Sequence, residues 1–339
     1  MALPPPPDDP LSDDGLERMF LSLDRASGIV AAVSGGPDSI ALMHLLARWA
    51  AGPGRPPVFV ATVDHGLRPE AAEEAAFVAR EAAALSLPHR TLPWTGSKPA
   101  AGVQEAAREA RYRLLVAHAR ELGASHLVTA HTLDDQAETV MMRLARGSGL
   151  QGLSGMRRET DRQGIRHGRP LLGLPKSLLL DLCRREGWRF VLDPSNANEL
   201  YARVRWRRLM PLLAEEGLTA GRLARLAERA ARADEALDRM AREALERAGP
   251  VQEGGGLAFQ AGALGREPFE IAVRMLALSL ARIGLESPRL SRLEACAERL
   301  REAVDQGQAL RATVAGALVR LDPGGKVTLA REPPRRRGR

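Results

Sequence analysis

The 339-residue chain has only two cysteines, Cys183 and Cys296, and they stand far apart. They form no C-x-x-C pair, so we expect neither a disulfide framework nor a cysteine zinc site, and a reducing cytoplasm fits. No apolar run reaches the roughly 18 residues of a membrane-spanning helix. Residues 1–10 are acidic and proline-rich, unlike a secretory signal. We therefore expect a cytoplasmic protein with no membrane partner.

Lysine is nearly absent as well, and arginine takes its place. The net charge of +7 favours a polyanionic partner. The excess of arginine has two interpretations, a codon bias of the whole genome or selection for guanidinium groups that bind phosphate. Composition alone leaves both open.

The first part of the chain alternates apolar strands with alanine-rich helices. Strands are expected at 28–34, 57–66, 89–94 and 124–131, and helices at 39–50, 69–85 and 103–123. This alternation predicts an α/β fold with a doubly wound, mainly parallel sheet. Ligands of such sheets bind outside the carboxyl ends of the strands, where the polar segments 34–39, 64–68 and 131–135 fall.

The composition changes after about residue 213. Residues 218–249 have the pattern of one long helix or a pair of helices, and the glycines near 322–325 predict a hairpin. We expect a disordered leader over 1–14, a first domain over 15–215, a smaller α+β domain over 216–331 and a basic tail over 332–339.

The first polar segment reads Ser34-Gly35-Gly36-Pro37-Asp38-Ser39. Two glycines followed by a helix start are typical of an anion site, because free N–H groups and the helix dipole meet there. A carboxylate beside a phosphate is repulsive unless a cation lies between them, so Asp38 indicates Mg²⁺. The alternative is a plain turn in which Asp38 or Ser39 caps the helix. There is no Walker A loop, and the G-x-G-x-x-G at 147–152 follows a helical segment, which is the wrong context for a dinucleotide.

The acidic segment after the fourth strand contains His131, Asp134, Asp135 and Glu138. Asp135 and Glu138 are three residues apart, hence neighbours on one helix face. Such a cluster could bind Mg²⁺ or a cationic amine. The alternative is an acid-rich first helical turn that suits the dipole.

Three basic segments complete the candidates. His65 and Arg68 follow the second strand, and Arg108 and Arg111 share one side of a helix that could equally be a solvated face. The third segment interleaves arginines with aromatic residues, namely Tyr201, Arg203, Arg205, Trp206, Arg207 and Arg208. This pattern suits a nucleic-acid backbone with a stacked base, or an amphipathic helix whose arginines stay in water.

Together these segments resemble a known family. The Ser34–Ser39 loop resembles that of the N-type ATP pyrophosphatases. "VDHGLR", "AREARY", "TAHTLDDQAET", "RGSGLQGLSGM", "RPLL" and "DPSN" occur in the same order in tRNA(Ile)-lysidine synthetases, over about residues 28–212. The chain departs from the family at Thr132, where a second histidine is frequent, and at Val204 and Trp206 between the arginines.

The resemblance implies a Rossmann-like fold of the adenine nucleotide alpha hydrolase type and an ATP-dependent ligation. The lysine ε-amine would be joined to C2 of the wobble cytidine of the isoleucine tRNA with anticodon CAU, which changes codon reading from AUG to AUA. The C2 oxygen would first attack the α-phosphate of ATP and release pyrophosphate. The amine would then attack C2 and release AMP.

The resemblance also implies residue roles. Ser34, Gly35, Gly36, Pro37, Asp38, Ser39 and His65 would bind ATP, with Mg²⁺ on Asp38. Asp38, Arg111, His131 and Asp135 would be catalytic, Asp135 and Glu138 would bind lysine, and Arg203, Arg205, Arg207 and Arg208 would bind tRNA, with help from the second domain. A homodimer is among the expected states. The rival functions are a tRNA thiolase, for which the cysteines are wrong, an amidotransferase-type synthetase and a noncatalytic RNA-binding protein.

Overall fold

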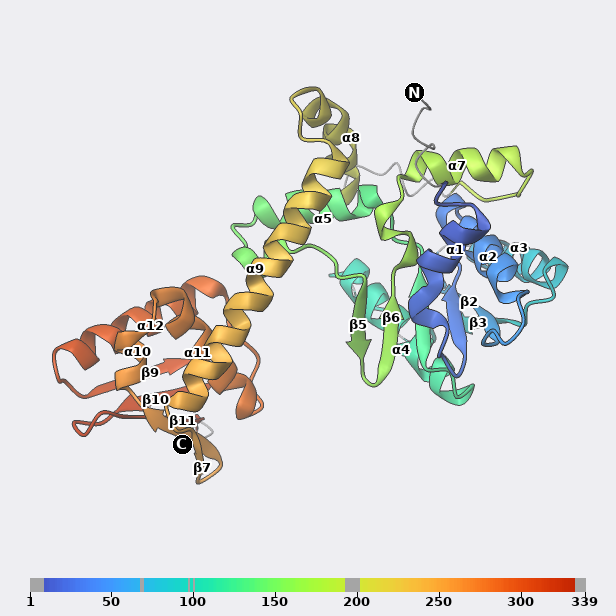
Figure 1. Cartoon of the computed structure of the whole chain (residues 1–339). Coiled ribbons are helices and arrows are strands. Elements are labelled where there is room, and N and C mark those ends of the chain that lie inside the picture. The colour runs from blue at the N-terminus through green and yellow to red at the C-terminus, as the bar shows by residue number, and fades with distance from the viewer. Residues whose placement is uncertain (1–8, 68–69, 97, 100, 193–201, 333–339) are drawn as a thin grey trace. The chain divides into compact units, whose positions relative to one another are not determined.

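The computed structural model describes residues 9–67, 70–96, 98–99, 101–192 and 202–332 (Figure 1). The chain divides into two compact units. The first comprises Met1–Met142 and Gly155–Arg225, and the second comprises Arg143–Ser154 and Leu226–Arg339. The expected domain limits at 215 and 216 stay a prediction. Among the described helices, none is long and apolar enough to cross a membrane.

The first unit contains a six-stranded sheet in the order β3-β2-β1-β4-β6-β5. The strands are β1 (Ile29–Ala32), β2 (Val58–Asp64), β3 (His89–Pro93), β4 (His126–Thr129), β5 (Glu159–Arg162) and β6 (Ile165–Gly168). All neighbouring pairs are parallel except β5 with β6. The prediction of a mainly parallel α/β sheet is confirmed.

The helices of this unit are α1 (Asp13–Phe20), α2 (Pro37–Ala50), α3 (Ala71–Ala84), α4 (Val103–Glu121), α5 (Leu133–Leu144), α7 (Lys176–Arg185) and α8 (Ala202–Glu215), with 3₁₀ turns η1 (Leu21–Leu23) and η2 (Pro170–Gly173). Helices cover both faces of the sheet. Successive strand residues point to opposite faces. Ile29 and Ala31 of β1 therefore pack in one core with α2 and α7, whereas Val30 and Ala32 pack with α4 in another. The alternation fixes a doubly wound arrangement.

The disordered leader expected over residues 1–14 extends too far toward the C-terminus, because its last residues are ordered. Helix α1 begins at Asp13, because the Ser12 Oγ accepts a hydrogen bond of 3.1 Å from the Gly15 N–H and caps the first turn. Leu11 and Leu16 are buried in the core of the first unit. Residues 1–8 lie outside the described residues, so the rest of the leader stays a prediction.

The β5–β6 hairpin was not predicted. Its turn residues Gln163 and Gly164 have φ angles of 55° and 86°, the two positive values that a type I′ turn requires. Strand β5 is polar and pairs only with β6, so it lacks an apolar run that would reveal it. The hairpin nonetheless carries His167, which is fully buried.

The second unit has its own core and an antiparallel sheet in the order β7-β8-β11-β10-β9. Its elements are α6 (Leu150–Leu153), β7 (Val251–Glu253), β8 (Gly256–Gln260), α10 (Gly262–Arg266), α11 (Phe269–Arg282), α12 (Leu290–Asp305), β9 (Leu310–Val314), β10 (Ala317–Leu321) and β11 (Lys326–Arg331). α9 (Ala220–Arg247) is one continuous helix, which excludes the helix pair. The predicted hairpin joins β10 to β11, with Leu321 opposite Val327.

Candidate active site

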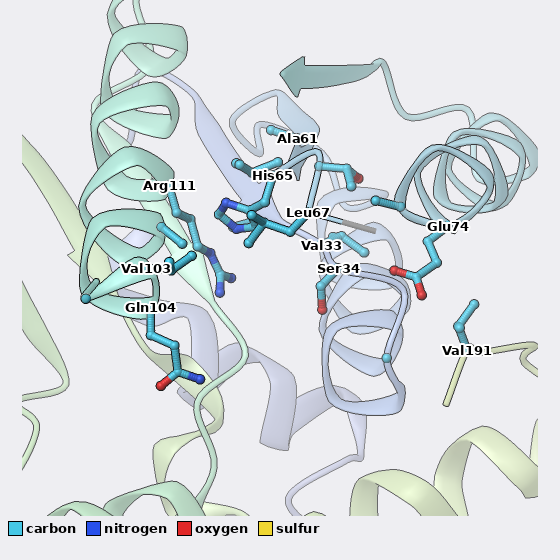
Figure 2. A pocket seen from close by; sticks show the side chains of 17 residues that line it. Val33, Ser34, Ala61, His65, Leu67, Glu74, Val103, Gln104, Arg111 and Val191 are labelled. Carbon is cyan, nitrogen blue, oxygen red and sulfur yellow. The ribbon is translucent and has the colours of Figure 1, made fainter. Parts of the chain in front are cut away.

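The candidate site lies at the carboxyl ends of the parallel strands in the first unit. A cavity of about 870 Å³ opens there, a size suited to a nucleotide. Its lining includes Ser34 and Gly36 after β1, His65 and Leu67 after β2, and Arg111 from α4. Figure 2 shows the Arg111 and His65 side chains across the cavity from Ser34. The sequence therefore located the cavity through its strand ends.

The Ser34–Ser39 loop turns directly from β1 into α2. Gly35 has a φ of 90°, which favours glycine, and its carbonyl accepts a hydrogen bond of 2.9 Å from the Val191 N–H. Gly36 is the N-cap residue, and no side chain caps the helix. The alternative in which Asp38 or Ser39 caps α2 is therefore wrong. The Ser39 Oγ accepts from the Ser34 N–H at 3.2 Å and so shapes the loop from within.

Asp38 is mostly buried and contacts a cation that sequence reasoning missed. Its Oδ2 lies 3.1 Å from Lys176 Nζ, while its Oδ1 is buried with no partner among the described residues. Burial raises the pKa of Asp38, and the Lys176 ammonium opposes that rise without cancelling it. The Lys176 N–H also donates to Asp134 at 2.7 Å, so the start of α7 contacts both polar segments. The only sequence signal for Lys176 was its rarity, since the chain has three lysines at 98, 176 and 326.

Arg111 is a half-buried cation that faces the cavity. Among the described residues it has no hydrogen-bond or ion-pair partner. Burial lowers the pKa of Arg111, and the neighbouring Arg108 adds to this effect, but an arginine stays charged. Arg108 itself is exposed beside the Tyr112 ring. Only one arginine of the predicted pair therefore lines the cavity, where an anion would supply its missing partner.

His65 lies beside Arg111 on the same wall. Its ring meets that of Trp94 edge-on, at a centroid distance of 5.9 Å. Burial lowers the pKa of His65, and the positive charge of Arg111 lowers it further. His65 is therefore a neutral lining group. Arg68, the other basic candidate of this segment, lies outside the described residues.

The acidic segment forms the start of α5. The Asp135 Oδ2 accepts from the Thr132 N–H at 2.9 Å, and the Asp135 N–H donates to the Thr132 Oγ1 at 3.3 Å. This reciprocal pair is a capping box, which gives Thr132 a structural role. The alternative of an acidic first turn is thus partly correct for Asp135. Its Oδ1 lies 3.9 Å from the Arg203 guanidinium.

Glu138 is buried between two arginines. Arg203 Nε donates to its Oε2 at 2.9 Å, and Arg207 Nε donates to its Oε1 at 2.8 Å. These arginines are four residues apart and share a face of α8. Arg205 and Arg208 are exposed. The common assignment of all four to tRNA is therefore revised, since Arg203 and Arg207 turn into the site, while a tRNA role for Arg205 and Arg208 stays a prediction. Tyr201 lies outside the described residues.

His131 is buried among positively charged side chains. Burial, with the positive charges of Arg169, Arg111, Arg203 and Arg108 around it, lowers the pKa of His131 to about 2. Its neighbour His167 has its pKa lowered to about 2 in the same way, with Arg169 and Arg162 as the nearest cations. Both histidines are neutral at physiological pH.

This neutrality predicts acid sensitivity of the first unit. His131 and His167 stay unprotonated in the folded state, whereas the unfolded chain takes up a proton at each below about pH 6.5. The free energy of unfolding should therefore fall by up to about 1.4 kcal/mol per pH unit for each histidine as the pH drops below about 6.5. His131→Gln removes the part of this decrease that comes from His131. Between neutral and acid pH, the free energy of unfolding should therefore fall less for the variant than for the wild type.

Urea unfolding followed by tryptophan fluorescence measures this, because all four tryptophans, at 49, 94, 188 and 206, lie in the first unit. Titrations at about pH 7.5 and about pH 5 suffice. A stability difference between wild type and variant that does not change with pH would contradict a neutral His131.

Comparisons with known proteins show which family the chain resembles. The family model of the PP-loop domain matches residues 12–213. The chain is 53% identical over 331 residues to the tRNA(Ile)-lysidine synthase of Methylobacterium nodulans, covering 94% of each chain. It is 50% identical to that of Rhodopseudomonas palustris, again covering 94% of each. Among solved structures, the U34-tRNA thiolase NcsA of Methanococcus maripaludis matches with a TM-score of 0.56 and 16% identity, over 65% of this chain and 79% of that one, which is a likeness of fold alone.

Proposed function

Because the chain belongs to the tRNA(Ile)-lysidine synthase family and carries its PP-loop domain, we propose that it ligates L-lysine to the wobble cytidine of the isoleucine tRNA with anticodon CAU. The proposed reaction has two steps. The C2 oxygen of the cytidine attacks the α-phosphate of ATP and releases pyrophosphate, and the lysine amine then displaces AMP from C2. The observation that carries the proposal is one cavity with a phosphate-type loop on one wall and, on the other, a guanidinium group that no described residue pairs with.

In the first step the loop would hold the departing pyrophosphate. The start of α2 offers backbone N–H groups and the positive end of a dipole, and Gly35 and Gly36 let the backbone approach closely. Arg111 would stabilise the negative charge that develops on the phosphoryl oxygens, since no described residue competes for its guanidinium group. His65 would contact the nucleoside as a neutral ring.

Asp38 fits a magnesium ion. It has one buried oxygen without a partner and a second beside an ammonium group, which is the environment of a carboxylate that expects a cation. Among the described residues no group of three or more histidine, cysteine, aspartate or glutamate side chains converges on a metal site. A single carboxylate together with substrate phosphates is a usual way to hold Mg²⁺. The ion would neutralise phosphate charge, and Asp38 would fix its place.

In the second step Asp135 and Glu138 would face the lysine. Only the neutral amine is a nucleophile, so the ammonium must lose a proton near C2. Asp135 offers its Oδ1, whose nearest described cation, Arg203, lies 3.9 Å away, whereas Glu138 is already held by Arg203 and Arg207. We therefore assign direct contact with the amine to Asp135, and to Glu138 the neutralisation of two arginines that would otherwise repel the ammonium.

The tRNA would bind through exposed positive charge. Arg205 and Arg208 of α8 are exposed and suit phosphate contacts. The target cytidine must leave its stack, at a cost of a few kcal/mol. Helices of the second unit would add to the tRNA surface. The homodimer and the cytoplasmic location expected from the sequence stay predictions.

The test combines the purified protein with ATP, Mg²⁺, labelled lysine and a transcript of the isoleucine tRNA. We expect label in the tRNA, with AMP and pyrophosphate released in equal amounts. A transcript with uridine at the wobble position is the matched control and should take up no label. Incorporation of sulfur or ammonia in place of lysine would overturn the proposal.

A further inference from the structure

A chain of hydrogen bonds runs inward from His131. Its Nδ1 lies 2.8 Å from the Thr129 Oγ1, and the same oxygen lies 2.9 Å from the Nε2 of His167. The other ring nitrogen of His167, Nδ1, is 2.9 Å from Arg162 Nε and 3.2 Å from Arg169 Nη2. The chain connects the edge hairpin β5–β6 to the end of β4.

The arginines determine where every proton in this chain lies. A guanidinium group only donates, so the His167 Nδ1 must accept, and a neutral His167 then carries its proton on Nε2. That proton is donated to the Thr129 Oγ1. The Thr129 hydroxyl must donate in turn, and the His131 Nδ1 is its acceptor.

The opposite arrangement is costly. If His131 carried its proton on Nδ1, the Thr129 oxygen would accept from both histidines, and its own hydroxyl proton would need another acceptor. Thr129 is only 1% exposed, and no other acceptor is within hydrogen-bond distance among the described residues. A buried hydroxyl without an acceptor is strongly disfavoured.

The two arginines are themselves held in place. The Arg162 guanidinium stacks on the Tyr112 ring at 3.7 Å from its centroid. Arg169 is buried and donates to the Arg157 carbonyl at 2.7 Å. The two guanidinium groups can only donate, so they fix the donor-to-acceptor direction of every hydrogen bond from His167 to His131.

We propose that Thr129 and His167, oriented by Arg162 and Arg169, are positioning residues that fix His131 as a neutral imidazole with its proton on Nε2. His131 then donates that proton in a hydrogen bond to a substrate oxygen that gains negative charge during the ligation. This rests on the proposed function. No described residue accepts from His131 Nε2, which leaves this donor to a ligand.

The electrostatic surroundings agree with this tautomer. Arg169, Arg111, Arg203 and Arg108 face His131, and together with burial they lower its pKa to about 2. The largest causes of the shift are burial and these positive charges, all of which disfavour a charged imidazolium. His131 is therefore not a cation. It is also not the base that deprotonates the lysine amine, because its unprotonated nitrogen, Nδ1, already accepts a hydrogen bond from the Thr129 hydroxyl.

Nuclear magnetic resonance tests the tautomer without any substrate. Protein labelled with ¹⁵N-histidine gives seven rings, and His131→Gln assigns the one of interest. We expect the two-bond ¹H–¹⁵N pattern of a neutral ring protonated on Nε2 between about pH 5 and about pH 8, the range around the ordinary histidine pKa. A ring protonated on Nδ1, or a doubly protonated ring, would overturn the proposal whatever the protein ligates.

A second experiment uses activity. Thr129→Val removes the hydroxyl at nearly constant volume, while Thr129→Ser retains it. We expect the valine variant to lose about tenfold in kcat with little change in the KM for ATP, and the serine variant to recover most of the loss. The His131 pattern should change in the valine variant alone. Equal losses in both variants, or an unchanged pattern with valine, would contradict the relay while leaving the ligation itself intact.

Discussion

Asp38→Asn is expected to reduce lysine incorporation by at least about a thousandfold, the effect of removing a group that fixes charge at a phosphoryl centre. Asparagine preserves the volume of the side chain but removes the negative charge that faces Lys176 and would hold Mg²⁺. Because this charge would serve adenylation, the first step should fail. In a single turnover, no labelled adenylated tRNA should then be detectable with α-labelled ATP, and no labelled pyrophosphate with γ-labelled ATP.

The matched control is Asp181→Asn. Asp181 lies on α7, like Lys176, but is exposed, and among the described residues it pairs with Arg184 alone, at 3.8 Å. Its substitution should leave both steps at wild-type rates. If Asp38→Asn retained adenylation within about tenfold of the wild type, that is within about 1.4 kcal/mol of barrier, the assignment of the ion to this carboxylate would be wrong.

Glu138→Gln should affect the other half of the reaction. The substitution removes the carboxylate that contacts both Arg203 and Arg207 beside the site of the lysine ammonium, and leaves Asp135, 3.9 Å from Arg203, as the nearer remaining counter-charge. We expect the KM for lysine to rise by about a hundredfold, equal to about 2.7 kcal/mol, because two guanidinium groups then repel the substrate. Adenylated tRNA should still form from ATP and accumulate. A single-turnover experiment with a delayed lysine chase separates the two steps.

The loss of one partner from a buried ion pair also costs about 3–5 kcal/mol of stability, so folding must be checked by urea titration. Asp135→Asn supplies a second test that breaks no buried pair and should raise the lysine KM in the same direction. Glu109→Gln, an exposed carboxylate on α4, is the charge control. Loss of adenylation together with lysine use in a folded Glu138→Gln protein would contradict the division of the site.

Much of the first unit could be predicted because its signals are local. Strands β1 and β4 are buried on both faces, and β1 therefore appears as a continuous apolar run. The Ser34–Ser39 loop follows such a run and precedes a helical pattern. Its location at the edge of the sheet could therefore be predicted from the residues next to it in the sequence. The second sheet was harder to predict from the sequence, because only its β10–β11 hairpin gave a turn signal.

What could not be predicted depends on contacts between distant residues. The periodicity of α8 reveals that Arg203 and Arg207 share a face, but not that this face meets Glu138, 65 positions before Arg203. Lys176 has no motif around it that points to Asp38. His167 lies on a polar edge hairpin whose only local signal is the turn at Gln163 and Gly164. In each case the role of the polar side chain depends on a contact with a residue distant in sequence, and the residues next to it give no signal of that contact.

The Lys176–Asp38 pair has a consequence for how the enzyme would load its metal. The Asp38 carboxylate lies 3.1 Å from the tethered ammonium of Lys176, which neutralises it. Uptake of Mg²⁺ at Asp38 would then exchange one cation for another, and the affinity for the metal would depend on competition with Lys176. The displaced ammonium would become available to pair with the negatively charged triphosphate.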